Sequence, residues 1–500
     1  MDRLRNTYSE LLQPKRRKMN CCSRKCELST LYGLSIVFLG LAILTLAGWE
    51  KAYNSIIFNA LTLTNTSKGY NMWKKTPIPM YLELYLYNWT NADEVIASNF
   101  DIKPNFQECG PYVYEEVHTR VNLKWHENGT LTYQQKRTWQ FVPELTNGSL
   151  EDEIVNVNVI VATVAYNVRH SSFITKAIVN RFLKVMNESL IVTRSARQLL
   201  FEGYNDPLLD FASSLNISIP FNKFGWFYGR NNSETYDGVF NIYTGRTDLD
   251  LLGMMDLWNH VPHTNIYEGY CDYVNGTTGE VWPPVKHVQK VAVFSPDICS
   301  TVWLSYEQDV SMLEVIGRKY ISTNFTLDNG VLYPELACFN YGDPVPTGAR
   351  NVSACKFGAP AFVTLPHFYL ADDEYLQNVS GISPNKSEDE FYMILEPNTG
   401  IPMAVKAQMQ INILLEPISG ISLLNSVKST FMPVLWFRQT ATLTGEYAGL
   451  VRLLLNLPHI AIYTGYGVLC LGIVILFIGI YVTLASRRKE ETEALISETT

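Results

Sequence analysis

The chain has 500 residues, of which 47% are hydrophobic and 18% are charged, and its formal net charge is −8. These proportions exclude an intrinsically disordered or fibrous chain, and the length exceeds what one compact core usually holds. The charges are unevenly placed, because residues 28–49 and 460–484 carry none.

The two uncharged stretches predict transmembrane helices. At about 1.5 Å per residue they reach roughly 33 and 37 Å, enough to cross a hydrocarbon core of about 30 Å. The first stretch also fits a cleavable signal peptide, since Thr45-Leu46-Ala47 is a passable small-residue cleavage site. Its apolar run is longer than the usual h-region and a polar arm precedes it, which favours an uncleaved anchor.

Basic residues beside the two stretches predict the topology. Residues 1–27 contain eight Lys and Arg residues, and Arg487, Arg488 and Lys489 follow the second stretch. The positive-inside rule therefore places residues 1–27 and 485–500 in the cytoplasm as short tails. Residues 50–459 form the luminal or extracellular domain.

The predicted luminal domain is acidic and rich in glycosylation sequons. It contains 29 basic and 41 acidic residues, a formal charge of −12, which disfavours nucleic acid as a partner. Every N-x-S/T sequon of the chain lies in it. The candidate glycosylation sites are Asn65, Asn88, Asn128, Asn147, Asn187, Asn216, Asn231, Asn275, Asn324, Asn351, Asn378 and Asn385.

The cysteines of the luminal domain and those of the N-terminal tail have different expected roles. The luminal domain holds Cys109, Cys271, Cys299, Cys338 and Cys355, where an oxidising compartment permits disulfides. Five is an odd number, so one thiol stays free; Cys109 is the outlier by position, and the other four allow three pairings. In the N-terminal tail, Cys21, Cys22 and Cys26 are candidates for reversible acylation beside the membrane, or are inert reduced thiols.

Alternating apolar residues predict a mostly antiparallel sheet. The alternation runs through residues 80–89, and residues 112–125 lead through Asn128-Gly129 into a second alternating stretch, which is typical of a hairpin. Residues 239–245, the Asp328-Asn329-Gly330 turn and residues 404–418 repeat this pattern.

Residues 154–203 break the alternation and predict two or three helices inserted into the β-rich domain. Lys176, Asn180 and Lys184 form a polar row at helical spacing, with Arg181 beside it. One interpretation is a solvated face above a stripe that packs on the core. The other is an exposed basic, amphipathic helix that meets an anionic ligand. The apolar side carries Phe173, Ala177, Ile178 and Phe182.

No motif for catalysis or metal binding stands out. G-x-S-x-G, H-E-x-x-H, the P-loop and G-x-G-x-x-G are absent from the sequence. His260 and His263 lack a nearby third ligand, and Asp372 and Asp373 fit an ordinary surface loop better than a Ca²⁺ or acid site. We expect a protein that is not an enzyme and needs no metal or cofactor.

The C-terminal tail contains an acidic dileucine pattern, formed by Glu491, Leu495 and Ile496. Two adjacent aliphatic side chains can fill an apolar pocket of a clathrin adaptor while the glutamate meets basic groups. The pattern predicts endosomal or lysosomal sorting.

Several segments resemble the class B scavenger receptor family, nearly end to end and in the expected order. They are ECGPYVY (residues 108–114), LLFEGYNDPLL (199–209), YDGVFNIYTG (236–245), NGTTGEVWPP (275–284), SPDICSTVW (295–303), FGAPAFVTLPHFYLAD (357–372) and EPNTGIPMAVKAQMQINI (396–413). The family includes fatty acid translocase, the high-density-lipoprotein receptor, a lysosomal integral membrane protein and insect sensory neuron membrane proteins.

The resemblance implies a fold and a set of sites. The fold is a luminal α+β domain, an antiparallel β-barrel-like core with an apolar tunnel, capped by a helical bundle at about residues 154–203 and held between two transmembrane helices. The implied disulfides join Cys271 to Cys338 and Cys299 to Cys355. The candidate ligand contacts in the cap are Lys176, Arg181, Lys184, Phe173 and Phe182.

The resemblance also implies partners and location. We expect a receptor for lipids, lipoproteins or anionic phospholipid surfaces that mediates their uptake or transfer. The alternative is a lysosomal or endosomal receptor that sorts a protein cargo such as a hydrolase. Either function places the protein in the plasma membrane, the endosome or the lysosome.

Overall fold

The computed structural model describes residues 21–209 and 222–499, so most of the N-terminal tail and the Asn216 sequon lie outside the described residues. The chain divides into two compact units. One unit runs from Phe58 to Leu450, and the other combines the chain up to Ile57 with the chain from Val451.

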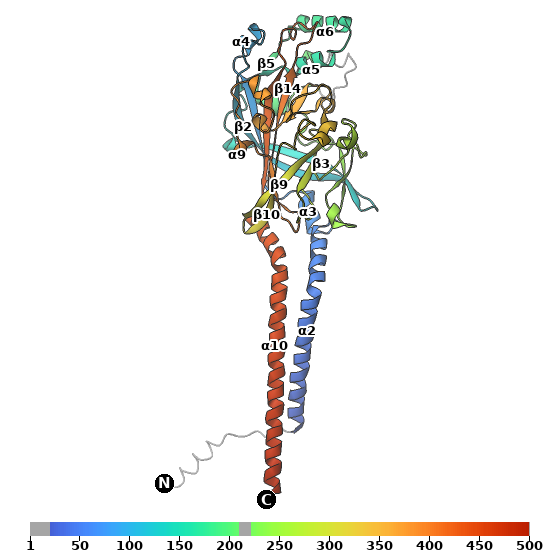
Figure 1. Ribbon diagram of the computed structural model, residues 1–500, viewed down its shortest axis with the longest axis vertical. Coiled ribbons are helices and arrows are strands. Elements are labelled where there is room, and N and C mark those ends of the chain that lie inside the picture. The colour runs from blue at the N-terminus through green and yellow to red at the C-terminus, as the bar shows by residue number, and fades with distance from the viewer. Residues whose placement is uncertain (1–20, 210–221, 500) are drawn as a thin grey trace, which may run out of the picture. The chain divides into compact units, whose positions relative to one another are not determined.

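Two long apolar helices, α2 (Cys21–Leu61) and α10 (Gly445–Glu498), contain the predicted spans. Both are long and apolar enough to cross a membrane, which confirms the two predicted membrane helices (Figure 1). The Ser35 hydroxyl of α2 donates to the Gly472 carbonyl of α10 over 3.0 Å. A Cβ on Gly472 would lie only 3.2 Å from Leu39, so glycine lets the two backbones approach closely, as small residues do in membrane helix pairs.

Within the described part of the unit between Phe58 and Leu450, fifteen strands form the sheets. They are β1 (Met80–Trp89), β2 (Phe106–Trp125), β3 (Thr130–Phe141), β4 (Glu153–Val157), β5 (Ile191–Ser195), β6 (Val239–Tyr243), β7 (Met255–Trp258), β8 (Lys290–Ser295), β9 (Ser300–Met312), β10 (Val315–Ile321), β11 (Arg350–Asn351), β12 (Ala361–Thr364), β13 (Tyr392–Leu395), β14 (Pro402–Leu415) and β15 (Thr430–Thr442).

Thirteen strands make one antiparallel sheet that closes into a near-barrel. The order is β7-β6-β3-β2-β1-β15-β14-β13-β10-β9-β8, with β12 and β11 attached to β14. Thr277, which is fully buried, bridges both Met254 before β7 and Val293 of β8. Because β7 and β8 are the two edge strands of the sheet, this short segment links the edges at one point and brings the sheet close to a closed ring. The predicted barrel-like antiparallel core is confirmed.

Short helices connect the strands. The α-helices are α3 (Lys68–Lys74), α4 (Ala92–Ala97), α5 (Val159–Asn167), α6 (Phe173–Val185), α8 (Glu374–Gln377) and α9 (Lys386–Asp389). Single turns are η1 (Pro143–Leu145), η2 (Gln198–Glu202), η3 (Leu249–Leu251), η4 (Gly269–Asp272), η5 (Pro334–Phe339), η6 (Ser353–Cys355) and η7 (Pro366–Phe368).

Two sequence-based expectations need correction. Residues 154–203 are not wholly helical, because β4 and β5 pair with each other and flank α5 and α6. Each of these strands is only five residues long, too short for periodicity to distinguish a strand from a helix, and the pairing of β4 with β5 determines their structure. The Asp328-Asn329-Gly330 turn joins no hairpin; its aspartate instead accepts backbone hydrogen bonds from Gly330 and Leu332.

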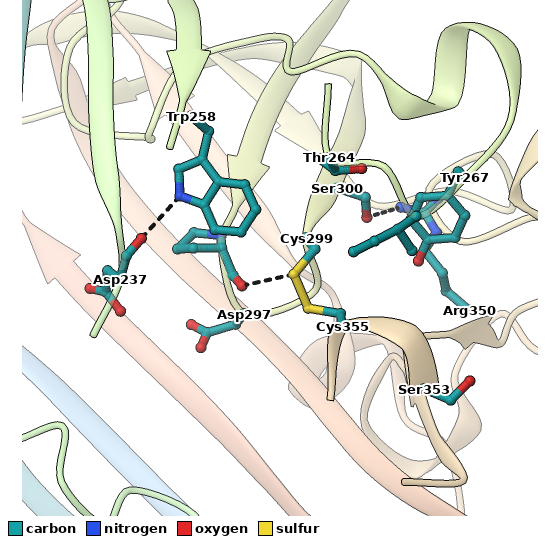
Figure 2. The surroundings of a disulfide bond; sticks show 12 residues. Asp237, Trp258, Thr264, Tyr267, Asp297, Cys299, Ser300, Arg350, Ser353 and Cys355 are labelled. Atoms are coloured by element: carbon teal, nitrogen blue, oxygen red, sulfur yellow. Dashed lines mark hydrogen bonds between the residues drawn. A yellow bond between two sulfur atoms is a disulfide. The ribbon is translucent and has the colours of Figure 1, made fainter. Parts of the chain in front are cut away.

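Two disulfides cross-link the later part of the domain. Cys271 is bonded to Cys338 and Cys299 to Cys355, the pairs that the family resemblance implies. The second bond ties the start of β9 to η6 (Figure 2). The two closed loops interleave, and long loops of this kind contribute a few kcal/mol by restricting the unfolded chain.

Candidate functional site

Helices α5 and α6 occupy the region predicted to be the cap. The Asn158 side chain caps α5, and the Ser172 side chain caps α6 by accepting from the Thr175 amide. α5 is apolar on nearly all sides and buried, whereas α6 is amphipathic and buries only Val179 and Leu183. In Figure 1, α6 lies at one end of the unit and α3 and β10 lie at the other.

α6 exposes an apolar face. Phe173 is 78% exposed, Ile174 71% and Ile178 56%. With Ala177, Arg181, Phe182, Val185 and Met186 these residues line a shallow groove. Single exposed apolar side chains are common on protein surfaces, but a contiguous set on one helix is typical of an interaction surface. Arg181 places a positive charge within it.

The residues in the polar row of α6 differ in their exposure to solvent. Lys176 is half-buried against Gly420, and the Asn180 side chain accepts hydrogen bonds from both the Ser422 amide and its hydroxyl, at 2.9 and 2.8 Å. Lys184 is exposed, one helical turn beyond Arg181. The predicted ligand contacts therefore divide: Phe173, Arg181 and Lys184 are exposed, while Lys176 and Phe182 are half-buried.

A cavity of about 300 Å³ lies inside the barrel, at the lower end of the usual range for ligand sites. α5 forms part of its wall through Val159, Ile160 and Val164. Met409, Ile411 and Ile413 of β14 add apolar surface, and aromatic rings from several elements complete it. The helix beneath α6 thus also lines the interior.

One part of the cavity wall is charged. The lining residues Arg137, Arg230, Asp297 and Lys356, together with Asp237 behind them, are called the charged cluster below. Arg230 pairs with Asp297 at 2.9 Å and with Asp237 at 3.2 Å, and Arg137 pairs with Asp237 at 2.8 Å. Although burial alone would raise the pKa of Asp297, attraction from Arg230 holds it well below its usual range. The carboxylate therefore stays ionised.

A second set of charged residues adjoins the cavity, whose lining includes Glu116. His118 lies between two carboxylates, 2.5 Å from Glu116 and 2.6 Å from Glu280, and Glu280 also pairs with Arg120. Burial opposes the charge on His118, but Glu116 attracts its proton and the pKa of His118 is raised. Burial also opposes ionisation of Glu280, yet Arg120 outweighs it and holds the pKa of Glu280 far below its usual range.

His367 also lies between two carboxylates. Its ring nitrogens lie 2.8 Å from both Asp389 and Glu108, and the Trp436 indole also donates to Glu108. A carboxylate only accepts hydrogen bonds, so both nitrogens must carry protons to satisfy both partners. Burial alone would lower the pKa of His367, but these hydrogen bonds raise it to about 9.

Neither the charged cluster nor these histidine sites was predicted from the sequence. Each of these sites joins residues from segments that lie tens to hundreds of positions apart, such as His118 with Glu280 and His367 with Glu108, so no local spacing could reveal a complete site. The His260 and His263 pair stays an ordinary loop pair in which His263 contacts Asp272, at 3.4 Å. Among the described residues, no group of three or more His, Cys, Asp and Glu residues could hold a metal.

Most described sequons are accessible. Asn65, Asn128, Asn147, Asn187, Asn231, Asn275, Asn324, Asn378 and Asn385 are exposed, and Asn88 is half-buried. Asn351 differs, because it is only 4% exposed and its side-chain amide donates to the Tyr341 carbonyl over 2.9 Å. Its side-chain oxygen accepts from the Ser353 amide and hydroxyl.

We expect no glycan on Asn351 in the folded protein, because a glycan would replace these buried hydrogen bonds. Glycopeptide mapping should find the Asn351 site unmodified. Asn351→Gln should leave the glycan mass unchanged but lower the free energy of unfolding by about 1–3 kcal/mol, since buried partners lose their bonds. Asn378→Gln, at an exposed sequon, is the control and should leave stability unchanged. An Asn351 glycopeptide from folded protein would contradict this prediction.

The candidate tail sites are only partly described. Cys21 and Cys22 begin α2, and Cys26 is an exposed free thiol on it. Cys109 and Cys470 are also free, and burial raises the pKa of Cys109. Glu491, Leu495 and Ile496 are exposed near the end of α10. The sorting pattern is therefore accessible to a partner.

Comparison with known proteins finds one matching family and several relatives. The CD36 family profile matches residues 31–483. Protein peste of Drosophila melanogaster is 31% identical over 87% of this chain and 79% of its own. Scavenger receptor class B member 1 of Sus scrofa is 29% identical, covering 91% and 89% of the two chains. Lysosome membrane protein 2 of Rattus norvegicus is 27% identical, covering 94% and 97%.

Proposed function

Because the chain belongs to the CD36 family, we propose that it is a class B scavenger receptor that binds lipids, lipoproteins or anionic phospholipid surfaces at α6 and takes lipid into the barrel cavity. Its two tails lie in the cytoplasm, and the barrel lies in the lumen or outside the cell. The protein works at the plasma membrane and in endosomes or lysosomes.

The exposed face of α6 carries this proposal. Phe173, Ile174 and Ile178 offer apolar side chains to an acyl layer, while Arg181 and Lys184 offer positive charge to phosphate or carboxylate groups. The domain as a whole has a formal charge of −12, so a basic helix is a local exception. Charge complementarity therefore favours an anionic lipid surface as the partner of α6.

The cavity supports the uptake step. An acyl chain gains about 0.8 kcal/mol for each methylene that leaves water, and the cavity wall is largely apolar. α5 lines the cavity and also packs against α6. Lipid that leaves a particle at α6 would therefore meet the helix that borders the interior.

We expect the double variant Arg181→Glu/Lys184→Glu to bind phosphatidylserine vesicles about tenfold more weakly at low salt, because four units of charge change at the docking surface. The difference should shrink between 0.1 and 1 M salt as the Debye length falls from about 10 to 3 Å. Full-length protein in nanodiscs would be tested by vesicle capture. Lys176 is left unchanged because it packs against Gly420.

Lys103→Glu/Lys124→Glu is the matched control, since both residues are exposed and lie outside α6. It makes the same change in net charge and should leave vesicle capture near the parent level. Equal capture by both double variants would reject α6 as the docking surface.

The alternative function is a lysosomal receptor that sorts a protein cargo, with a clathrin adaptor at the tail. The exposed Glu491, Leu495 and Ile496 favour it, as does the likeness to lysosome membrane protein 2. Pull-down of luminal proteins and of lipid by the same full-length protein would separate the two functions.

We expect Leu495→Ala/Ile496→Ala to move the protein toward the cell surface, because an adaptor pocket would lose both apolar anchors. Surface biotinylation would measure the shift. Thr492→Ala/Ser497→Ala changes the same segment but keeps the pattern and serves as the control. Surface levels equal to the parent in the first variant would refute adaptor sorting through these residues.

A further inference from the structure

Tyr273 is an exposed aromatic side chain beside a candidate glycosylation site. It is 51% exposed, and its ring packs against the His263 ring, with 4.3 Å between the two ring centroids. The sequon asparagine Asn275 follows it by two residues and is also exposed. In the full sequence, no other sequon has Tyr, Phe or Trp two residues before its asparagine. This turn alone therefore combines an aromatic ring and a sequon at that spacing.

The backbone places the two side chains on one face. Tyr273 is extended, with φ −70° and ψ 136°, and the Val274 side chain that follows it is buried. The Val274 amide donates to the Pro262 carbonyl over 2.9 Å. Side chains two residues apart in an extended segment point to the same side, so Tyr273 and Asn275 both face solvent.

The Asn275 side chain is free to carry a sugar. Its oxygen accepts a hydrogen bond from the Gly276 amide over 2.6 Å, and its main-chain carbonyl accepts from the Thr301 hydroxyl over 3.0 Å. Within residues 21–209 and 222–499, its side-chain nitrogen donates no hydrogen bond. That nitrogen is the atom to which an N-glycan is attached. Unlike at Asn351, glycosylation here would break no hydrogen bond of the folded protein.

The sequon belongs to the segment that links the two edges of the sheet. Its hydroxyl residue, Thr277, is fully buried and bridges Met254 and Val293. A Cβ on Gly276, which has a φ of +81°, would lie 2.2 Å from the Ala292 carbonyl oxygen, so only glycine fits. Recognition of a sequon requires its hydroxyl residue, which the folded chain conceals. A glycan must therefore be added before this segment packs, and the folded turn then fixes its attachment point.

We propose that Asn275 carries an N-glycan whose first N-acetylglucosamine packs on the Tyr273 ring and stabilises the segment that links the edge strands β7 and β8. The face of an aromatic ring carries negative charge and the C–H groups of a sugar ring are weakly positive, so the two surfaces attract each other. The contact also removes exposed aromatic surface from water. The inference rests on the proposed placement of the barrel outside the cytoplasm and is independent of the ligand.

Thermal unfolding of the full-length glycoprotein in detergent, arranged as a double-mutant cycle, tests this contact. Asn275→Gln removes the glycan and should lower the melting temperature by about 2 °C in the parent background. In a Tyr273→Ser background the same change should have no effect, because the sugar no longer has a ring to pack on. Tyr273→Phe keeps the ring and should keep the whole difference.

Asn324→Gln is the matched control, since Asn324 is an exposed sequon asparagine with Ser322 two residues before it. Its effect on the melting temperature should be the same with and without Tyr273. Trimming high-mannose glycans to a single sugar with an endoglycosidase should preserve the difference at Asn275, because only the first sugar makes the contact. Loss of the difference on trimming would overturn the assignment to that sugar.

Glycopeptide mapping separates this inference from the placement on which it rests. If Asn275 is unmodified while Asn324 and other exposed sequons carry glycans, the contact is overturned and the placement stands. The same holds if Asn275→Gln acts equally in the parent and Tyr273→Ser backgrounds. If no sequon carries a glycan, the placement outside the cytoplasm fails and the inference fails with it.

Discussion

Replacing Arg120 with methionine should cost about 3–5 kcal/mol of the free energy of unfolding, because it leaves a buried carboxylate without its strongest partner. The Arg120 side chain is fully buried, and its guanidinium pairs with Glu280. The same group donates to the Trp73 carbonyl over 2.8 Å and to the Thr76 hydroxyl over 3.1 Å. The arginine therefore attaches α3 and the chain after it to β2.

Thermal unfolding of the full-length protein in detergent would measure the loss. Arg197→Met is the matched control, because Arg197 pairs with Glu151 at 2.6 Å but the two side chains are 40% and 68% exposed. An exposed pair contributes at most about 1 kcal/mol. The double variant Arg120→Met/Glu280→Met removes both buried charges and should recover part of the loss. Equal losses in Arg120→Met and Arg197→Met would contradict this account.

The strands of the barrel were predictable because their pattern is local. Residues 80–89 alternate as β1 requires, and residues 404–418 overlap β14 almost completely. The order of the strands is not local. Ring closure depends on Thr277, a single residue that bridges two edges and carries no periodic pattern.

The difference between local patterns and long-range contacts also explains why the exposed residues of the cap were only partly predicted. Helical spacing grouped Lys176, Asn180 and Lys184 on one face, which is correct for an isolated helix. The loop containing Gly420 and Ser422 covers two of the three, and it lies more than 240 residues away in sequence. Periodicity finds a helical face, but only the fold determines which part of that face meets solvent.

The charged cluster is the part of the candidate site that the sequence predicted least. Arg137, Arg230, Asp297 and Lys356 come from four distant segments, and each reads as an ordinary polar residue in its local context. The predicted cysteine pairing offered one indication, since joining Cys299 to Cys355 also brings Asp297 and Lys356 together. A disulfide framework thus carries spatial information about residues beside the cysteines.

The stability of the barrel should fall as pH rises through the titration of His367. The folded pKa is raised to about 9, above the ordinary histidine value of about 6.5. Because the folded state binds the proton more tightly, its stabilisation is complete below about pH 6.5 and is lost between that pH and about 9. The His367 side chain is 16% exposed, so the contribution at acidic pH is on the order of 3 kcal/mol.

His367→Gln should therefore lower the melting temperature strongly at pH 5–6 and only slightly near pH 9.5. Glutamine can donate to one of the two carboxylates but cannot carry the charge. His287→Gln changes an exposed histidine and is the control. His118 has a raised pKa as well, so the variant keeps part of the pH dependence. A melting difference that stays constant from pH 5 to pH 9.5 would show that the positive charge of His367 does not stabilise the fold. The expected result means that the positive charge of His367 stabilises the fold at acidic pH and that this contribution is lost as the pH rises toward 9.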